Sequence, residues 1–286
     1  MKHIKKKQRK SIFNKGLLVV IASFSSLVML AHGDLSKRIA AKTHQIEKEP
    51  KNFTLYYERG LLYQEHKEYP EALQDYKKSK TLGNTNEVVN YRLAQVHFSI
   101  EKYDAALSDI TAYLKRNSTD VKGKKVEAQI LFKKKAYSKA LNSYQYVFEN
   151  TTDLRPEDVI EYTEITLAQN HDNYKDALTI IEKGLVKIGT KTTALQLKKL
   201  EYLVASKQEN KAIEQYNYFI KEIERKEFWY YRKAKYLAEI NRKEEAIINL
   251  KLATVTVDQL GTKFQNRSSV ITLKEQIKQL DNSINN

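Results

Sequence analysis

The stretch EYPEALQDYKKSKTLG, residues 68–83, carries a pattern that the chain repeats at nearly constant spacing. Tyr69 is followed by Ala72 and then by Tyr76, and the same arrangement of aromatic, alanine and large apolar residue begins again at Tyr103 and Tyr137. The alanine recurs at Ala72, Ala106, Ala140, Ala177, Ala212 and Ala246, at intervals of 34, 34, 37, 35 and 34 residues. A fixed period in this range is typical of solenoid proteins, which stack one structural unit per repeat.

Each repeat divides into two helical stretches. Residues 53–66, FTLYYERGLLYQEH, place apolar or small residues three or four apart, and residues 70–82, PEALQDYKKSKTL, do the same. Pro70 suits the first turn of a helix, and Gly83 suits the left-handed residue that ends one. The repeat is therefore predicted to be a helix-turn-helix hairpin.

Small residues explain why the alanine recurs. Two antiparallel helices approach closely only where side chains are small, so Gly60, Ala94 and Ala128 on the first helices are expected to face the repeated alanine. Larger apolar residues are expected to fill the space toward the next unit: Tyr76, Ile110, Tyr144, Ile181, Tyr216 and Leu250. Because one hairpin cannot bury both of its apolar faces, the hairpins are expected to stack.

The composition agrees with an all-α protein. The 286 residues include only eight glycines and three prolines, while helix-forming residues dominate. The chain has no cysteine, which excludes disulfides, cysteine-ligated zinc and thiol catalysis.

The first 33 residues have the order of a secretory signal. Seven basic residues in MKHIKKKQRKSIFNK account for seven of the fifteen net positive charges, and residues 16–33 hold no Asp, Glu, Lys or Arg. Ala31 and Gly33 are spaced like an export cleavage site, so the mature chain is expected to begin near Asp34. The alternative is a retained membrane anchor. In both cases the rest of the chain is exported across the cytoplasmic membrane, to the periplasm or envelope.

The repeat resembles the tetratricopeptide repeat family. The first unit matches the family pattern at Tyr56, Gly60, Tyr63, Tyr69, Ala72 and Tyr76, with Ser79 where alanine is usual. Later units depart from it: Asn90 and Lys124 replace the first aromatic, and Gln208 and Glu209 stand at the turn of the fifth unit. The resemblance implies a right-handed α-solenoid of about six stacked helix-turn-helix hairpins with terminal capping helices.

The resemblance covers residues 53–260, and helical segments flank it. Residues 34–52 read as one amphipathic helix before the first hairpin, and residues 261–286 as a capping helix and tail. In the latter, an apolar stripe is formed by Val270, Leu273, Ile277, Leu280 and Ile284. Such terminal helices cover the exposed ends of a solenoid.

No catalytic, metal or cofactor motif stands out in the sequence. The six histidines form no HExxH or paired ligand spacing, and the phosphate-binding, nucleophile-elbow and dinucleotide-binding glycine patterns are missing. His97 occupies a position that tyrosine usually holds and is expected to be a packed core residue. The prediction is a non-enzyme without cofactor or metal.

A solenoid offers a concave surface, which in this family is lined by the first helix of each hairpin. Aromatic, amide and lysine side chains there suit an extended peptide groove. The candidate partner-binding residues are Tyr57, Tyr91, Gln95, Phe98, Lys122, Lys125, Phe132, Tyr162, Phe228 and Tyr231. The alternative is that several of these aromatics pack within the superhelix instead.

These observations predict a protein-interaction scaffold of the cell envelope with a protein or peptide partner. Contact with a membrane is expected only through the N-terminal segment, if it is uncleaved. One alternative is RNA binding, because helical-hairpin repeats can read bases one per unit and tyrosines can stack on them. Export and the interleaving of lysines with acidic residues argue against a nucleic acid partner. The other alternative is an accessory subunit that positions an exported enzyme.

Overall fold

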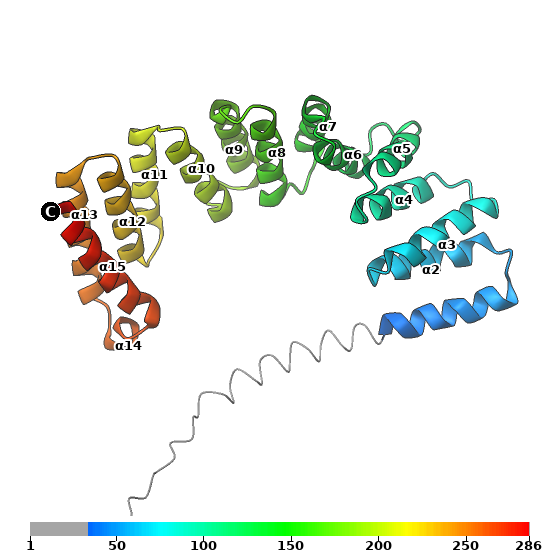
Figure 1. The fold of residues 1–286 in the computed structure, drawn as a ribbon, viewed down its shortest axis with the longest axis horizontal. Coiled ribbons are helices and arrows are strands. Elements are labelled where there is room, and N and C mark those ends of the chain that lie inside the picture. Colours follow the sequence, from blue (N-terminus) through cyan, green and yellow to red (C-terminus); the bar gives the residue numbers. More distant parts are fainter. Residues whose placement is uncertain (1–33, 286) are drawn as a thin grey trace, which may run out of the picture. The chain divides into compact units, whose positions relative to one another are not determined.

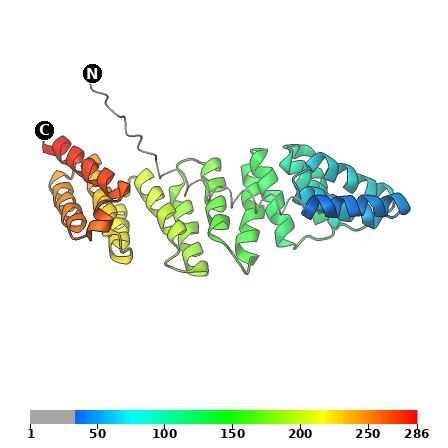
Figure 2. The same cartoon turned by 90° about the horizontal axis from the view of Figure 1, so that it is seen from below.

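The computed structural model describes residues 34–285, which form only helices and the turns between them. The predicted N-terminal signal or anchor, residues 1–33, lies outside the described residues. The chain divides into two compact units, residues 34–136 and residues 137–285 of the described part. Each unit is built from helices that pack against their neighbours in the chain (Figure 1, Figure 2).

Unit 1 begins with a helix over residues 34–48. The helices that follow are α2 (Phe53–Glu65), α3 (Tyr69–Thr81), α4 (Val88–Ser99), α5 (Tyr103–Leu114) and α6 (Val121–Lys133). Contacts join α2 with α3, α3 with α4, α4 with α5, and α5 with α6.

Unit 2 contains α7 (Tyr137–Asn150), α8 (Pro156–Gln169), α9 (Tyr174–Ile188), α10 (Thr193–Ala205), α11 (Glu209–Glu222), α12 (Lys226–Glu239) and α13 (Lys243–Asp258). The short α14 (Thr262–Gln265) and the long α15 (Ser268–Asn285) follow. Consecutive helices from α7 to α13 are in contact, and α15 packs against α12 and α13.

The helices α2 to α13 alternate as the first and second members of six repeats. We call α2, α4, α6, α8, α10 and α12 the A helices, and α3, α5, α7, α9, α11 and α13 the B helices. The third repeat is shared, because α6 belongs to unit 1 and α7 to unit 2. The predicted all-α fold of repeated hairpins is confirmed.

The repeated alanines lie on the B helices and are completely buried. All six have no exposed surface, and the large residue four positions later is at most 9% exposed in every repeat. The predicted spacing therefore identifies the core. A Cβ atom built on Gly60 would lie 2.7 Å from Cε1 of Tyr76, the large residue four positions after the repeated Ala72. The glycine makes room for the Tyr76 ring.

Turn and cap residues set the ends of the first hairpin. Pro70 lies in the first turn of α3, and Gly83 follows α3 with a φ of 101°. The amide of Asn84 donates to the carbonyl of Ser79, and the amide of Gly83 donates to the carbonyl of Lys80. This pair of bonds is the Schellman motif, which a left-handed residue makes possible.

Five of the turns from an A helix to a B helix use a left-handed residue that is not glycine. These residues are Lys67, Glu101, Lys135, Lys207 and Asn241, with φ between 56° and 65°. Each makes the same two backbone bonds as Gly83; at the first turn, for example, Glu68 donates to Tyr63 and Lys67 to Gln64. The turn from α8 to α9 has no residue with positive φ.

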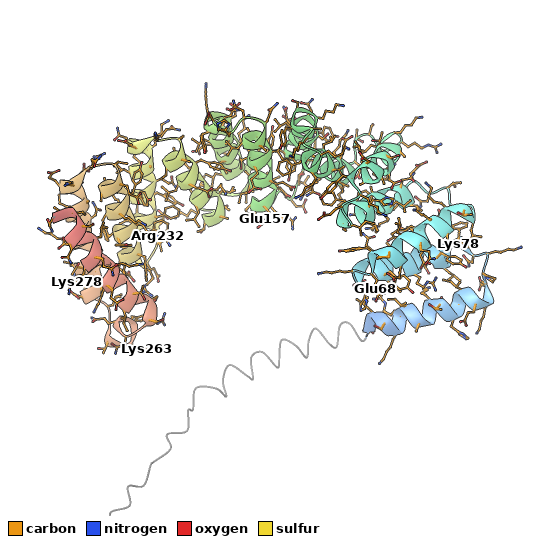
Figure 3. The ribbon with its side chains drawn as sticks, in the orientation of Figure 1. Glu68, Lys78, Glu157, Arg232, Lys263 and Lys278 are labelled. Atoms are coloured by element: carbon orange, nitrogen blue, oxygen red, sulfur yellow. The ribbon has the colours of Figure 1, made fainter. Side chains whose placement is uncertain are left out.

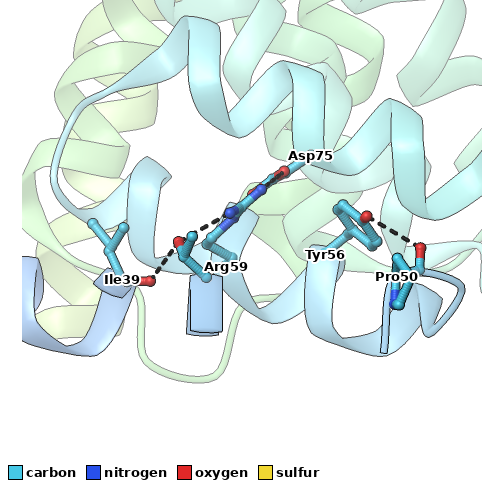
Figure 4. Close-up of polar contacts among 6 residues, drawn as sticks. Ile39, Pro50, Tyr56, Arg59 and Asp75 are labelled. Atoms are coloured by element: carbon cyan, nitrogen blue, oxygen red, sulfur yellow. Dashed lines mark hydrogen bonds and ion pairs between the residues drawn. The ribbon is translucent and has the colours of Figure 1, made fainter. Parts of the chain in front are cut away.

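Arg59 joins the N-terminal helix to the first hairpin (Figure 4). Its Nε and Nη2 atoms donate to the two carboxylate oxygens of Asp75 on α3, at 2.7 and 2.8 Å, and its Nη1 donates to Thr43 at 3.0 Å. The side chains of Arg59 and Asp75 are 16% and 6% exposed. A two-pronged pair of this kind fixes both position and orientation, so residues 34–48 are anchored on α2 and α3.

The last helix covers the end of unit 2. Val270, Leu273, Ile277 and Ile284 of α15 are buried in the cluster that contains Ala246 and Leu250 of α13, and Leu280 is partly buried there. The apolar stripe predicted for this segment is therefore turned into the core.

Candidate functional site

All ten predicted partner-binding residues lie on A helices. Unit 1 holds Tyr57 on α2, the three residues of α4 and the three residues of α6, while unit 2 holds Tyr162 on α8 and Phe228 and Tyr231 on α12. Lys122 is exposed, and the other nine side chains are half-buried. The structure groups them by unit, so each unit is described separately.

In unit 1 the predicted aromatic rings pack against B helices. The Tyr57 ring centre lies 5.8 Å from that of Tyr76, and the Tyr91 ring centre lies 5.3 Å from that of Tyr113. Phe98 lies 5.8 Å from Tyr103 in the same way. Ring pairs at these separations stabilise the fold. These three rings are therefore used partly for packing within unit 1, as the alternative interpretation of the aromatic residues expected.

Amide and hydroxyl groups link α2, α3 and α4 on this side of unit 1. Tyr76 donates its hydroxyl hydrogen to Oε1 of Gln64 at 2.7 Å, and Gln64 Nε2 donates to Oε1 of Gln95 at 3.3 Å. Gln95 Oε1 also accepts from Nη1 of Arg92 at 3.1 Å. Gln95 Nε2 then donates to the hydroxyl oxygen of Tyr91 at 3.1 Å. We call Gln64, Tyr91, Arg92 and Gln95 the α2–α4 polar array.

The Tyr91 hydroxyl is at the end of this array. It accepts a hydrogen bond from Gln95, and its own hydrogen has no acceptor among the described residues. Burial raises the pKa of Tyr91 above its usual value, so the hydroxyl keeps that hydrogen at neutral pH. Tyr91 can therefore donate to a carbonyl or carboxylate of a partner.

Arg92 belongs to the array but was not among the predicted site residues. The Arg92 guanidinium lies 5.6 Å from the centre of the Tyr91 ring, and its Nε atom is buried without a hydrogen-bond partner. Because Arg92 lies about one helical turn before Gln95 on α4, the helical period could have placed the two side chains together. The hydrogen bonds of the array could not be read from that period.

On α6, Lys122, Lys125 and Phe132 follow one another at helical spacing. Lys122 is exposed, and Lys125 and Phe132 are half-buried. Asp120 caps the start of α6 by accepting from the amide of Gly123 at 2.8 Å, which orients the first turn that carries Lys122. The lysines thus add positive charge to the A helix that follows α4 in the same unit.

In unit 2, Tyr162 contacts B helices. Its ring is stacked on Tyr144 with centres 5.6 Å apart, and it lies 5.6 Å from Phe148. Tyr162 also lines a hollow of about 450 Å³ whose other walls come from α7 and α9. It is therefore placed toward the B helices and not on a surface formed by A helices alone.

Phe228 and Tyr231 pack on the cluster that joins α12, α13 and α15. The Arg225 guanidinium lies 5.2 Å from the Phe228 ring centre, and Arg232 lies 4.7 Å from the Trp229 ring centre (Figure 3 labels Arg232). Trp229 in turn is stacked on Phe219 with centres 4.0 Å apart. The aromatic residues of α12 thus serve mainly to join α11, α12 and α13.

His97 is packed in unit 1 as the sequence predicted. His97 is 7% exposed, and its Nδ1 lies 2.7 Å from a carboxylate oxygen of Asp109, as expected for a packed histidine. In residues 34–285, no three His, Cys, Asp or Glu side chains are grouped as metal ligands would be. A search of the same residues for a helix that could span a bilayer finds none.

Comparison with solved structures identifies the architecture. A tetratricopeptide repeat protein from Parabacteroides merdae superimposes with a TM-score of 0.54 and 16% identity, covering 90% of this chain and 96% of that one. The C-terminal part of a tetratricopeptide repeat-containing protein from Cytophaga hutchinsonii superimposes with a TM-score of 0.57 and 18% identity, covering 79% and 95%.

The chain has the tetratricopeptide-repeat fold. No protein-family model matches the sequence, and no curated protein matches it either. At these low identities the tetratricopeptide-repeat structures show the architecture and leave the partner open.

Proposed function

We propose that this protein is a non-catalytic protein-interaction scaffold of the cell envelope, which binds a polypeptide through the A helices of its repeats. The observation that carries the proposal is the α2–α4 polar array. Half-buried amide, guanidinium and hydroxyl groups from two repeats meet there, and Tyr91 retains a hydrogen that a partner can accept.

Such an array suits the main chain of a polypeptide. An extended segment carries a carbonyl and an amide at every residue, and partly desolvated groups that are already held in place bind it with little loss of side-chain entropy. Lys122 and Lys125 of α6 lie in the same unit and suit acidic side chains of the same segment. The ring of Tyr57 packs on Tyr76 of α3, and the ring of Tyr91 packs on Tyr113 of α5, so both A helices that carry the array are held against B helices.

The envelope location rests on the sequence of residues 1–33. A basic segment followed by an uncharged apolar run directs export, and the remaining chain would then act outside the cytoplasm. Nothing among residues 34–285 provides another means of attachment through a membrane-spanning helix.

Affinity capture with the full chain from an extract of its own cell envelope tests the binding proposal. The site variant is Tyr91→Phe, which removes only the hydroxyl and leaves the ring that packs on Tyr113. Loss of one hydrogen bond to a neutral acceptor costs about 1 kcal/mol, so recovery of the partner should fall roughly fivefold. The matched control is Tyr218→Phe on the B helix α11, which should capture the partner as the native chain does.

Two outcomes would contradict the binding proposal. Equal capture by the native chain and Tyr91→Phe would move the site away from the polar array. Recovery of material that nuclease removes would instead support RNA binding, and a steep loss of binding with salt would be its further sign.

Fractionation of cells and N-terminal sequencing of the recovered chain test the location. Export with cleavage gives an envelope protein that begins near Asp34, and export without cleavage gives a membrane-bound protein that begins at Met1. Recovery of the full chain in the soluble cytoplasmic fraction would reject the proposed location.

A further inference from the structure

A groove in unit 2 has a composition that the proposed function does not use. It is a hollow of about 520 Å³ between the B helices α11 and α13, and α12 packs against both. We call it the α11–α13 groove. Its lining residues are Asn217, Ile220, Lys221, Lys226, Tyr230, Lys233, Glu245, Ile248, Asn249 and Leu252.

Apolar side chains form one side of the groove. Ile248 and Leu252 follow one another by one helical turn on α13, and they are 56% and 40% exposed. Ile220 and the ring of Tyr230 continue this apolar surface into the groove. Single exposed apolar residues are common, but several that converge on one hollow mark a binding surface.

Lysines of α11 and α12 line the groove together with these apolar residues. Lys221, Lys226 and Lys233 all line the groove, and none of them makes an ion pair within residues 34–285. The one carboxylate of the lining, on Glu245, is already paired with Arg242. Lys233 donates to Oδ1 of Asn217 at 2.8 Å, and burial lowers its pKa. Glu245 offsets part of this effect, and Arg242 adds to it. A partly buried ammonium group whose pKa is lowered by burial is stabilised by an incoming anion.

The neighbouring groove between α9 and α11 provides an internal comparison. It has a volume of about 680 Å³ and is lined by three lysines together with Glu182 and Glu214. Lys199 there is paired with Glu182 at 2.6 Å. The hollow between α7 and α9 is lined by two lysines and two glutamates. Among these hollows between successive B helices, the α11–α13 groove has the largest excess of lysines over carboxylates, with three lysines and one glutamate in its lining.

We propose that the α11–α13 groove binds an acidic amphipathic helix of a partner protein. The apolar stripe of that helix would contact Ile248, Leu252 and Tyr230, and its acidic side chains would pair with Lys221, Lys226 and Lys233. Helices bind grooves in this way through apolar residues three or four apart, and charges beside the groove select the partner.

A groove favours a helix over a lipid surface. A bilayer would meet Ile248 and Leu252 at the exposed rim, whereas Ile220 and Tyr230 within the hollow need a side chain that projects into it. This surface is also distinct from the α2–α4 polar array, which lies in unit 1, so each proposal can fail without the other.

A designed peptide serves as the probe. It is an alanine-based acidic amphipathic helix of about 20 residues, with leucines at i, i+4, i+7 and i+11 on one face and a few glutamates on the flanks of that face, and carries a fluorescent label. Its binding to the full chain is followed by fluorescence anisotropy. We expect saturable binding that weakens at least about tenfold between roughly 0.05 M and 0.5 M salt. A control peptide with lysine in place of each glutamate should not bind.

Matched variants locate the site. Ile248→Asp and the pair Lys221→Glu with Lys226→Glu change exposed side chains of the α11–α13 groove, and each should weaken peptide binding about tenfold or more. Lys175→Glu with Lys211→Glu makes the same charge change in the groove between α9 and α11 and should alter the affinity less than about twofold. Unchanged circular dichroism verifies that all variants fold.

Three results would overturn the proposal. The first is equal binding of the glutamate and lysine peptides, and the second is equal weakening by the two lysine pairs. The third is no peptide binding together with binding to phosphatidylglycerol-containing vesicles that Ile248→Asp abolishes, which would make this face a membrane contact. Tyr91→Phe should leave peptide binding unchanged, and this separates the result from a failure of the unit 1 proposal.

Discussion

The first hairpin, α2 with α3, and the fourth, α8 with α9, both contain a glycine at a close helix contact, but the glycine lies on the A helix in the first and on the B helix in the fourth. In the first hairpin the small residue is on the A helix, where a Cβ atom on Gly60 would lie 2.7 Å from the Tyr76 ring. In the fourth it is on the B helix, where a Cβ atom on Gly184 would lie 2.6 Å from Cγ1 of Val159. Close approach therefore needs one small side chain, and either helix can supply it.

The position that corresponds to Gly60 in the fourth hairpin shows the exchange. Gly60 lies twelve residues before the repeated Ala72, and Ile165 lies twelve residues before Ala177, so the two positions correspond. Ile165 is completely buried. Counting forward, Gly184 corresponds to Ser79 of the first hairpin, whose hydroxyl donates to the carbonyl of Phe53 at 2.9 Å. The two hairpins therefore carry their glycine on different helices, against Tyr76 in the first and against Val159 in the fourth.

Breaking the ion pair of the first hairpin should have the largest effect. Asp75→Ala leaves the Arg59 guanidinium, whose side chain is 16% exposed, without its carboxylate, and should lower the free energy of unfolding by about 3 kcal/mol. The fourth hairpin has Ile180 at this position and needs no such pair. Urea denaturation followed by circular dichroism measures the change.

A double variant separates charge burial from packing. Replacing both partners, Arg59→Met with Asp75→Leu, should restore most of the lost stability, because no charge is then left buried alone. If the double variant is as unstable as Asp75→Ala, the stability comes from the hydrogen bonds that orient Arg59 toward Asp75 and Thr43, and not from the pairing of opposite charges.

Filling the glycine of the fourth hairpin should have the next largest effect. Gly184→Ala gains helix propensity but forces its new methyl group against Val159 and Leu195, so a net loss of about 2 kcal/mol is expected. Adding Val159→Ala in the same chain should recover part of the loss, because the two sites share one contact. Denaturation of the single and double variants measures the coupling.

Gly261 provides the control for that prediction. A Cβ atom on Gly261 would meet no atom within 4 Å, so Gly261→Ala should change stability by less than about 0.5 kcal/mol. Equal effects at Gly184 and Gly261 would mean that α9 moves away from α8 at no cost, and the proposed exchange of small residues would be wrong.

Removing the N-cap of α2 should have a smaller effect. The Asn52 side chain accepts a hydrogen bond from the amide of Thr54 at 3.1 Å, so Asn52→Ala should cost about 1 kcal/mol. The fourth hairpin begins α8 differently, with Pro156 in the first turn and the Asp158 carboxylate accepting from the amide of Arg155. Lys51→Ala, on an exposed neighbour, should be neutral in the same denaturation assay.

Substitutions in the turns of the two hairpins should have the smallest effect on the free energy of unfolding, and one of them should increase it. Lys67→Gly removes the cost of a left-handed side-chain residue and should raise the free energy of unfolding by about 0.5–1 kcal/mol. His171→Gly, in the turn without a left-handed residue, should lower it by a similar amount, because the unfolded chain gains freedom. Thermal denaturation should give opposite signs; the same sign would refute the comparison.

The repeat period predicted the helices and the core well, because a hydrophobic spacing of three and four residues requires one buried face. The six buried alanines follow from the period, and Pro70 at the start of α3 and the left-handed Gly83 follow from the backbone preferences of proline and glycine. The other left-handed residues could not be predicted by type, because three of the five are lysine and none is glycine.

The candidate site was predictable only in part. The helical face of Tyr91 and Gln95 follows from the period, but Gln64 and Gln95 are 31 residues apart and their hydrogen bond depends on how two repeats pack. The packing of the Tyr57 and Tyr162 rings on B helices also arises from contacts between helices. The unpaired charge of the α11–α13 groove has the same origin, since sequence alone does not say which lysines find a carboxylate.

The short reach of the helix contacts bears on how the protein folds. Within each unit, the extensive helix–helix contacts join helices that are at most three places apart in the chain. A fold made from contacts so near in sequence has low contact order, and such proteins close their loops quickly and fold fast. A hairpin can therefore form and pack against its neighbour as soon as both have been synthesised, before the C-terminal part of the chain is complete.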